Sequence, residues 1–187
     1  MKNAVISKET LLNQCREMVS ENGLSSISMR GVAERCNVAL GSLYNYYPSK
    51  KDLLLAVIES VWHDIFHMDQ TCRAGDSFVL YTQWIFDSVH QGMALYPHFF
   101  TAHSISFASA DKATARETMA HYFCHMKEGL LQVLRSDPQI NPEAIGEKLH
   151  EEALVDYVLD SLLSLLLMHR DSCDVLLEML RRSLYYK

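Results

Sequence analysis

The segment between residues 28 and 47 constrains the fold of this chain more than any other, because it combines two short helical patterns with a very tight connection. Ala33 is small enough to lie where two helices cross, and Leu43 can fill the space beneath them. Asn37 falls at the connection, where the backbone needs a positive φ that Gly and Asn adopt more readily than other residues. The pattern therefore predicts two helices, one capped by Ser28 and one beginning near Ala39.

A third helical pattern precedes this pair. Ser7 can cap it, and Asn22-Gly23 supplies a left-handed stop at its end. Three short helices with a tight joint between the second and third form a helix-turn-helix arrangement, whose last helix enters the major groove of DNA. We therefore expect residues 1–50 to be a three-helix, helix-turn-helix DNA-binding domain.

The rest of the sequence also predicts helices, so the expected fold class is all-α. The chain has only seven Gly and four Pro in 187 residues, and no segment reads as a strand. We expect residues 51–187 to form a helical regulatory and dimerisation domain. Its expected helices cover residues 50–67, 78–96, 97–107, 112–135, 142–170 and 172–186.

Charge is distributed unevenly between these two parts. Residues 1–51 contain seven Lys and Arg against four Glu, a net charge of +3, within a chain whose total is -6. The remaining residues hold ten basic against nineteen acidic side chains, a net charge of -9. A basic N-terminal part on an acidic body favours phosphate binding by the first part alone.

Several classes of protein are disfavoured. The five cysteines are scattered without a Cys-x-x-Cys pair, and the N-terminus lacks the pattern of a secretory signal, so we expect a cytoplasmic protein without disulfides, cofactors or a membrane partner. No catalytic motif is present, so we expect no enzyme. The pairs His63/His67 and His121/His125 each put two imidazoles on one helix face, but two ligands do not make a metal site.

Residues 23–54, GLSSISMRGVAERCNVALGSLYNYYPSKKDLL, resemble the signature of the TetR family of bacterial transcriptional regulators. The matching elements are a Ser cap, a Val-Ala pair, the turn Asn37-Val38-Ala39 and the run from Gly41 to Lys50. Asn37 replaces the usual turn glycine, Ala39 the usual serine, and Leu40 a residue that is polar in many members. The resemblance implies a repressor that binds a palindromic operator as a homodimer and is released by an unknown small molecule.

Roles carried over by position concern three surfaces. Contacts to double-stranded operator DNA are expected from Ser28, Arg30, Ala39, Leu40, Gly41, Ser42, Tyr44, Asn45, Tyr46 and Lys50. Tyr47 is expected in the core and Arg35 in solvent. A ligand pocket is expected to involve Trp62, Phe66, Trp84, Phe99, Phe100, Tyr122 and Met126. The interface of the homodimer is expected to use Leu154, Val158, Leu162, Leu165, Leu166, Leu176, Met179 and Leu180.

Other interpretations of the same residues stay open. Each aromatic or methionine could belong to an ordinary core, and the apolar residues of the last two helices could serve only their own chain. A DNA-binding dimer whose body has no small ligand, and serves a protein partner or a structural role instead, is the main alternative to a ligand-responsive repressor. A metal sensor and an enzyme are weaker alternatives.

Overall fold

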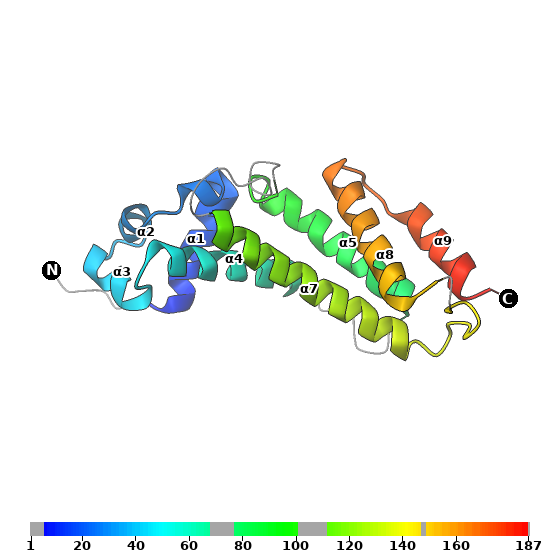
Figure 1. The fold of residues 1–187 in the computed structure, drawn as a ribbon. Coiled ribbons are helices and arrows are strands. Elements are labelled where there is room, and N and C mark those ends of the chain that lie inside the picture. The colour runs from blue at the N-terminus through cyan, green and yellow to red at the C-terminus, as the bar shows by residue number, and fades with distance from the viewer. Residues whose placement is uncertain (1–5, 68–76, 101–111, 147–148, 187) are drawn as a thin grey trace. The chain divides into compact units, whose positions relative to one another are not determined.

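The computed structural model describes residues 6–67, 77–100, 112–146 and 149–186. Within these ranges the chain is all-helical and contains no strand, as the sequence predicts (Figure 1). The helices are α1 (Lys8–Asn22), the short 3-10 helix η1 (Leu24–Ser26), α2 (Met29–Arg35), α3 (Leu40–Tyr46), α4 (Lys50–His67), α5 (Phe78–Leu95), α7 (Lys112–Ser136), α8 (Glu151–Leu167) and α9 (Asp174–Leu184).

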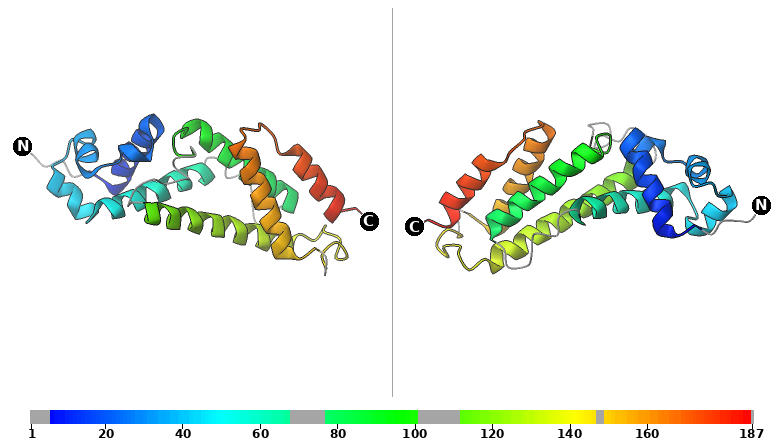
Figure 2. Two further views of the ribbon diagram at one scale, coloured as in Figure 1. Left: turned by 45° about the horizontal axis from the view of Figure 1, so that its top comes forward. Right: turned by 180° about the vertical axis from the view of Figure 1, so that it is seen from behind.

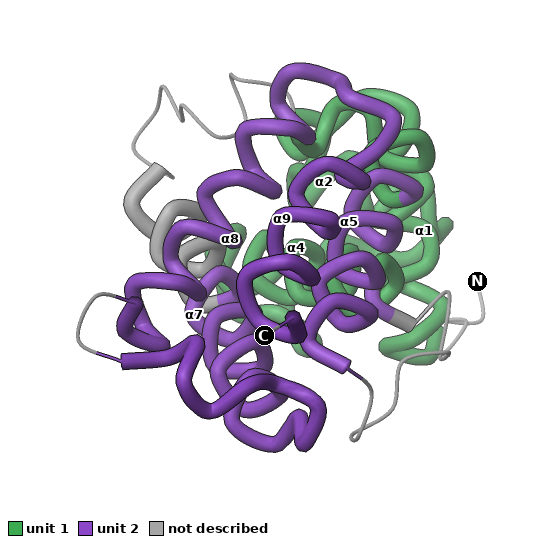
Figure 3. The backbone as a smooth tube through the Cα atoms, turned by 90° about the vertical axis from the view of Figure 1, so that its right-hand side faces the viewer, with its two compact units in different colours: residues 1–65, 92–121 green, residues 66–91, 122–187 purple. Residues whose placement is uncertain are grey.

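Packing divides the chain into two compact units. Unit 1 comprises residues 1–65 and 92–121, and unit 2 comprises residues 66–91 and 122–187 (Figure 3). Helices α4, α5 and α7 each contribute residues to both units. The boundary at residue 50 that the sequence suggests stays a prediction.

Local signals set the ends of the N-terminal helices as expected. The Ser7 hydroxyl accepts a hydrogen bond from the Thr10 backbone N–H at 3.0 Å, and α1 stops at Gly23, whose φ is +74°. A Cβ at residue 23 would lie 2.9 Å from the Cβ of His98, so this position needs glycine for its backbone angle and for close packing. Buried Leu11, Cys15 and Val19 form the inner face of α1.

Two expected helices differ from the structure. Residues 97–100 form turns, and residues 101–107 lie outside the described part of the chain. The helix expected from residue 142 begins only at Glu151. The Asn141 side chain accepts from the N–H of Glu143, and its carbonyl accepts from the N–H of Ala144 at 2.9 Å, but these bonds close only a turn over residues 142–144 and no helix follows.

The core of unit 2 consists of apolar side chains from α5, α7, α8 and α9. A buried carboxylate, Asp137, connects three of these helices just after α7 ends. One of its oxygens accepts hydrogen bonds from the N–H of Phe78 at the start of α5 and from the hydroxyl of Tyr185 at the end of α9. Its other oxygen accepts from the N–H of Gln139. Because its partners are donors, this carboxylate can be buried without an opposing charge.

Candidate DNA-binding surface

The joint between α2 and α3 has the geometry of a tight turn between crossing helices. Asn37 adopts φ +52°, and the N–H of Val38 donates to the carbonyl of Ala33 at 3.0 Å. Ala33 and Leu43 are buried between the helices. Figures 1 and 2 show α2 and α3 lying together with α1 in unit 1. The predicted crossing is therefore present, and the residues that were expected to shape it do so.

The outer side of α3 faces away from this core. Ala39, Gly41, Tyr44 and Asn45 are exposed, and Leu40 and Ser42 are half-buried. A Cβ built on Gly41 meets no atom within 4 Å, so nothing inside the protein requires glycine at this position. Glycine lowers the helical propensity of this short helix, but because it has no side chain, another molecule can approach the helix backbone closely at this position.

The start of α2 lies beside the same surface. The Ser28 hydroxyl oxygen accepts from the N–H of Gly31 at 3.1 Å, which caps the helix and leaves the hydroxyl hydrogen for an outside acceptor. Arg30 is exposed in the first turn of α2, and Lys50 is exposed at the start of α4. These positions suit contacts to a phosphate backbone.

Tyr46 and Tyr47, adjacent in sequence, occupy different environments. The Tyr46 hydroxyl donates to the backbone carbonyl of Ile6 at 2.5 Å, so its proton has a partner within the protein, and its expected contact to phosphate stays a prediction. Tyr47 is 3% exposed, as the sequence predicts for a core residue. Its hydroxyl oxygen is buried and has no hydrogen-bond partner among the residues that the structure describes.

Arg35 is exposed to solvent, as the sequence predicts, but it also has several partners within the protein. Its guanidinium donates to Glu21 at 2.7 and 3.1 Å, to Glu17 at 3.3 Å and to Gln14 at 3.4 Å. The hydrogen bond from Arg35 lowers the pKa of Glu21 and raises that of Arg35. Arg35 therefore connects the end of α2 to one side of α1, and its charge is balanced there.

The aromatic residues expected around a ligand fall into two groups. In unit 1, the Trp62 ring packs edge-on against Phe99 and Phe100 at centroid distances of 5.8 and 5.5 Å, and all three side chains are buried. In unit 2, Trp84 lies 5.5 Å from Phe66 and 5.4 Å from Tyr81, and these three rings are only half-buried. Tyr122 is half-buried and Met126 is buried, both also in unit 2.

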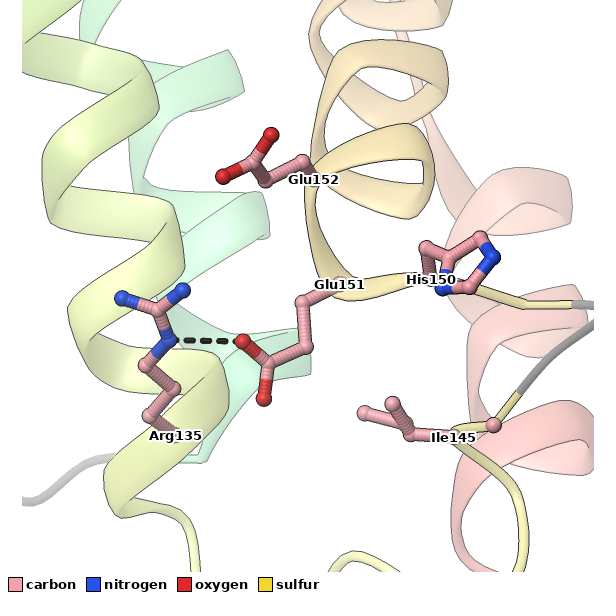
Figure 4. A pocket seen from close by; sticks show the side chains of 6 residues that line it. Arg135, Ile145, His150, Glu151 and Glu152 are labelled. Atoms are coloured by element: carbon pink, nitrogen blue, oxygen red, sulfur yellow. Dashed lines mark hydrogen bonds and ion pairs between the residues drawn. The ribbon is translucent and has the colours of Figure 1, made fainter.

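A pocket of about 410 Å³ lies between the end of α7 and the start of α8 in unit 2 (Figure 4). Its lining is charged, and Arg135 donates to Glu151 at 2.6 Å across it. None of the residues expected to bind a ligand lines this pocket, which is formed by Arg135, Ile145, Gly146, His150, Glu151 and Glu152.

The residues expected at a dimer interface are mostly core residues of their own chain. Leu154, Val158, Leu162, Leu166, Leu176 and Leu180 are buried within unit 2, Leu165 is half-buried, and only Met179 is exposed. The other outward apolar side chains of this region are Tyr157, Leu167, Met168, Val175 and Tyr186. A helix that is apolar nearly all round does not indicate which side faces its own core.

Charged side chains on α7 to α9 pair within the protein. Asp156 binds Lys127 at 2.5 Å, while Arg181 and Arg182 bind Glu178. Within the described residues, no group of three or more His, Cys, Asp or Glu side chains could hold a metal ion. None of the described helices is both long enough and apolar enough to cross a membrane.

Residues 7–57 match the family model of bacterial regulatory proteins, tetR family. Over 111 residues the chain is 29% identical to the HTH-type transcriptional repressor KstR of Mycolicibacterium smegmatis. This match covers 59% of this chain and 54% of KstR, so the chain spans about half the length of that relative. It is 25% identical to KstR of Mycobacterium tuberculosis over 90% of this chain and 74% of the relative. The regulator UidR of Escherichia coli is 38% identical over 52 residues, 28% of this chain and 26% of UidR.

Solved structures extend the likeness in fold to most of the chain. A putative fatty acid metabolism regulator of Clostridium perfringens superposes with a TM-score of 0.54 over 93% of this chain and 96% of its own, at 17% identity. A TetR transcriptional regulator from Rhodococcus sp. RHA1 superposes with a TM-score of 0.51 over 92% of this chain and 90% of its own, at 20% identity. The match to the family model over residues 7–57 covers α1, α2, α3 and the first part of α4, and α2 and α3 within it have helix-turn-helix geometry.

Proposed function

We propose that this protein is a DNA-binding transcriptional repressor that places α3 in the major groove of a palindromic operator. The observation that carries the proposal is the outer face of α3, where Gly41 has open space on its Cβ side and exposed Tyr44 and Asn45 flank it. Asn45 can pair with adenine through two hydrogen bonds, and Ser42 can donate or accept. Ser28, Arg30, Tyr44 and Lys50 contact phosphates in this proposal. Its relatives are named repressors or regulators and not enzymes, which supports the same reading.

Gly41 offers a sharp test, because its replacement by alanine separates folding from DNA binding. Alanine is the better helix former by about 0.5–1 kcal/mol, so Gly41→Ala should keep or raise thermal stability. The added methyl group blocks close approach to DNA, so affinity should fall by about tenfold or more, equal to 1.4 kcal/mol.

Gly146 is the matched control, since a Cβ there also meets nothing within 4 Å and the residue belongs to unit 2. Both variants are measured by fluorescence anisotropy on duplexes that the wild-type protein selects from a random library. Gly146→Ala should bind like wild type. Unchanged affinity in Gly41→Ala, or a wild type that selects no duplex, would contradict the proposed function.

We also propose that the protein acts as a homodimer formed through the exposed apolar side chains of α8 and α9. These are Tyr157, Leu167, Met168, Val175, Met179 and Tyr186. Exposed apolar area of this kind is costly in water and marks an interaction surface. A two-fold dimer would bring the same surface of each copy together and would match the symmetry of a palindromic site.

Val175, which is 77% exposed, is the position to test. Val175→Lys should convert the dimer to a monomer in sedimentation velocity and weaken operator binding. Leu80 on α5 is 52% exposed and lies outside the proposed surface, so Leu80→Lys is the control for adding a charge at an exposed apolar position. A Val175→Lys protein that remains dimeric would exclude this surface.

Release of DNA by a small molecule completes the proposal. The half-buried rings of Phe66, Tyr81 and Trp84 support a site for a flat apolar ligand, since they pack together and keep accessible surface, whereas the Trp62 group is core. A thermal-shift screen across drugs, lipids and cations tests it, because a ligand at 100 times its Kd adds about 2.7 kcal/mol of stability. A Trp62→Phe background leaves Trp84 as the only tryptophan, so binding at this site should change its fluorescence. Uniformly flat responses would favour a regulator without a small ligand.

A further inference from the structure

One side of α1 is joined to α4 and to the residues after α5 by a chain of polar side chains. The Arg16 guanidinium donates to the hydroxyl of Ser60 and lies 3.9 Å from one oxygen of Asp64. The other oxygen of Asp64 accepts from the Tyr96 hydroxyl at 2.6 Å. Ser60 and Tyr96 are buried, whereas the side chains of Arg16 and Asp64 are 24% and 35% exposed, so the chain of contacts runs from the interior to the surface. Hydrogen bonds in which one partner is charged are stronger than neutral ones.

A second set of contacts holds the same segments together further along α1. The Ser20 hydroxyl donates to the carbonyl of Leu95 at 2.6 Å. Gly23 approaches His98 so closely that a Cβ would not fit. All of these residues belong to unit 1, so the end of α5 is packed as part of the same body as the helix-turn-helix.

The opposite side of α1 is joined to the DNA-facing helices. Arg35 at the end of α2 binds Glu17 and Glu21, and Tyr46 at the end of α3 binds the carbonyl of Ile6 just before α1. Helix α1 therefore has polar connections on two sides, one to α2 and α3 and the other to α4 and the end of α5.

We infer that contacts with the end of α5 fix the position of α1, and that α1 in turn fixes the position of α2 and α3. Arg16, Asp64 and Tyr96 are then positioning residues for DNA binding. The inference rests on the proposed function. None of the three residues contacts DNA in this arrangement; they act by fixing α1, to which the DNA-facing helices are attached. Loss of the Tyr96–Asp64 hydrogen bond should allow α1 to shift and should misplace Ser28, Arg30 and the face of α3.

The inference predicts a specific pattern in binding data. Tyr96→Phe and Asp64→Asn should each weaken affinity for a wild-type-selected duplex by about fivefold or more. The dependence of affinity on salt should keep its slope, because no side chain that neutralises a phosphate is removed. A variant in which a phosphate contact is lost would instead flatten the slope.

A matched control separates positioning from general stability. Tyr185 in unit 2 also donates its hydroxyl to a carboxylate, Asp137, and burial followed by that hydrogen bond raises its pKa to about 12. Burial and the hydrogen bond to Asp64 likewise raise the pKa of Tyr96. Tyr185→Phe therefore removes the same kind of bond, and the two variants should lose similar thermal stability.

The full-length proteins are compared by anisotropy at several salt concentrations and by thermal unfolding. The expected result is weakened DNA binding with an unchanged salt slope in Tyr96→Phe and wild-type affinity in Tyr185→Phe. Equal losses in both variants, or wild-type affinity in both, would overturn the positioning role while leaving the proposed function intact. A wild-type protein that binds no duplex would instead refute the proposed function itself.

Discussion

Replacing Tyr47 with phenylalanine should make this protein more stable, although it deletes a polar atom from a well-packed core. The ring lies beneath the helix-turn-helix and is 3% exposed. Its hydroxyl oxygen is buried, and no hydrogen-bond partner for it occurs in the described residues. The hydroxyl has therefore lost its water on folding without gaining a hydrogen-bond partner in the described part of the chain.

The size of the effect follows from that loss. A buried polar group without a hydrogen bond costs about 1–3 kcal/mol. The dispersion contacts of one oxygen offset part of this, at about 0.1–0.2 kcal/mol for each atom pair. A net gain of about 1 kcal/mol would raise the Tm of a chain of this length by about 2–4 °C.

Tyr46→Phe is the internal control, because it makes the same chemical change at the neighbouring residue. The Tyr46 hydroxyl is hydrogen-bonded to the Ile6 carbonyl, so its removal should cost about 0.5–1.5 kcal/mol and lower the Tm. Both variants are measured by calorimetry at one protomer concentration, since the Tm of a dimer depends on concentration. A Tyr47→Phe protein less stable than wild type would refute the reasoning.

The same pair of proteins makes a pH prediction. Burial, with smaller contributions from nearby Cys15 and Glu59, raises the pKa of Tyr47 from 10.0 to about 12. Above pH 10 the unfolded chain ionises at this residue before the folded one does, so wild type loses stability as the pH rises towards 12. The advantage of Tyr47→Phe should widen over that range, and a constant difference would contradict the assigned burial.

Three further predictions concern packing, DNA contact and the Arg35 cluster. A methyl group at Gly92 would lie 2.7 Å from Cγ1 of Ile65, so Gly92→Ala should cost about 1–3 kcal/mol, and Ile65→Ala in the same chain should recover part of that loss in a double-mutant cycle. Arg30→Gln should flatten the salt dependence of DNA binding by about 0.9 in slope, whereas Lys127→Gln, which removes a charge paired with Asp156, should leave the slope unchanged. The hydrogen bond from Arg35 lowers the pKa of Glu21. The ion pair between them therefore stabilises the fold fully above pH 4.5, the ordinary pKa of Glu, and this stabilisation is lost as the pH falls through the lowered pKa of Glu21 in the folded protein. Glu21→Gln should therefore have a lower Tm than wild type at pH 7, and the two Tm values should converge in acid. A Tm difference that persists in acid would show that the ion pair is not the cause of that difference.

Most of the geometry of the candidate DNA-binding surface could be predicted from sequence, because its signals are local. Ser7, Ser28 and Gly23 determine helix ends within a few residues of themselves, and Asn37 marks a turn by its own backbone preference. The exposed face of α3 follows once the turn is placed. The hydrogen bond from the Tyr46 hydroxyl to Ile6, forty residues earlier, could not be predicted, because no short-range pattern indicates that contact.

The helices after α4 were predicted less completely, for a related reason. Apolar periodicity predicted helices in the positions of α8 and α9 but not which side each turns towards its own core, so buried Val158 and exposed Tyr157 could not be distinguished by role. The start of α8 was placed nine residues early, since Asn141-Pro142 has the composition of a helix start but uses its polar groups in a turn held by Leu184.

The amino-acid sequence by itself determined that this chain is helical, where its first helices begin and end, and that α2 and α3 meet at a tight turn, because those properties depend on interactions between residues close along the chain. Only the tertiary structure decided that Arg16, Asp64 and Tyr96 form one polar chain, and which apolar side chains of α8 and α9 remain exposed. The same holds for the buried Tyr47 hydroxyl, which has no hydrogen-bond partner among the residues that the structure describes. These features join residues tens of positions apart, and their energies depend on burial and distance, which exist only once the helices have packed.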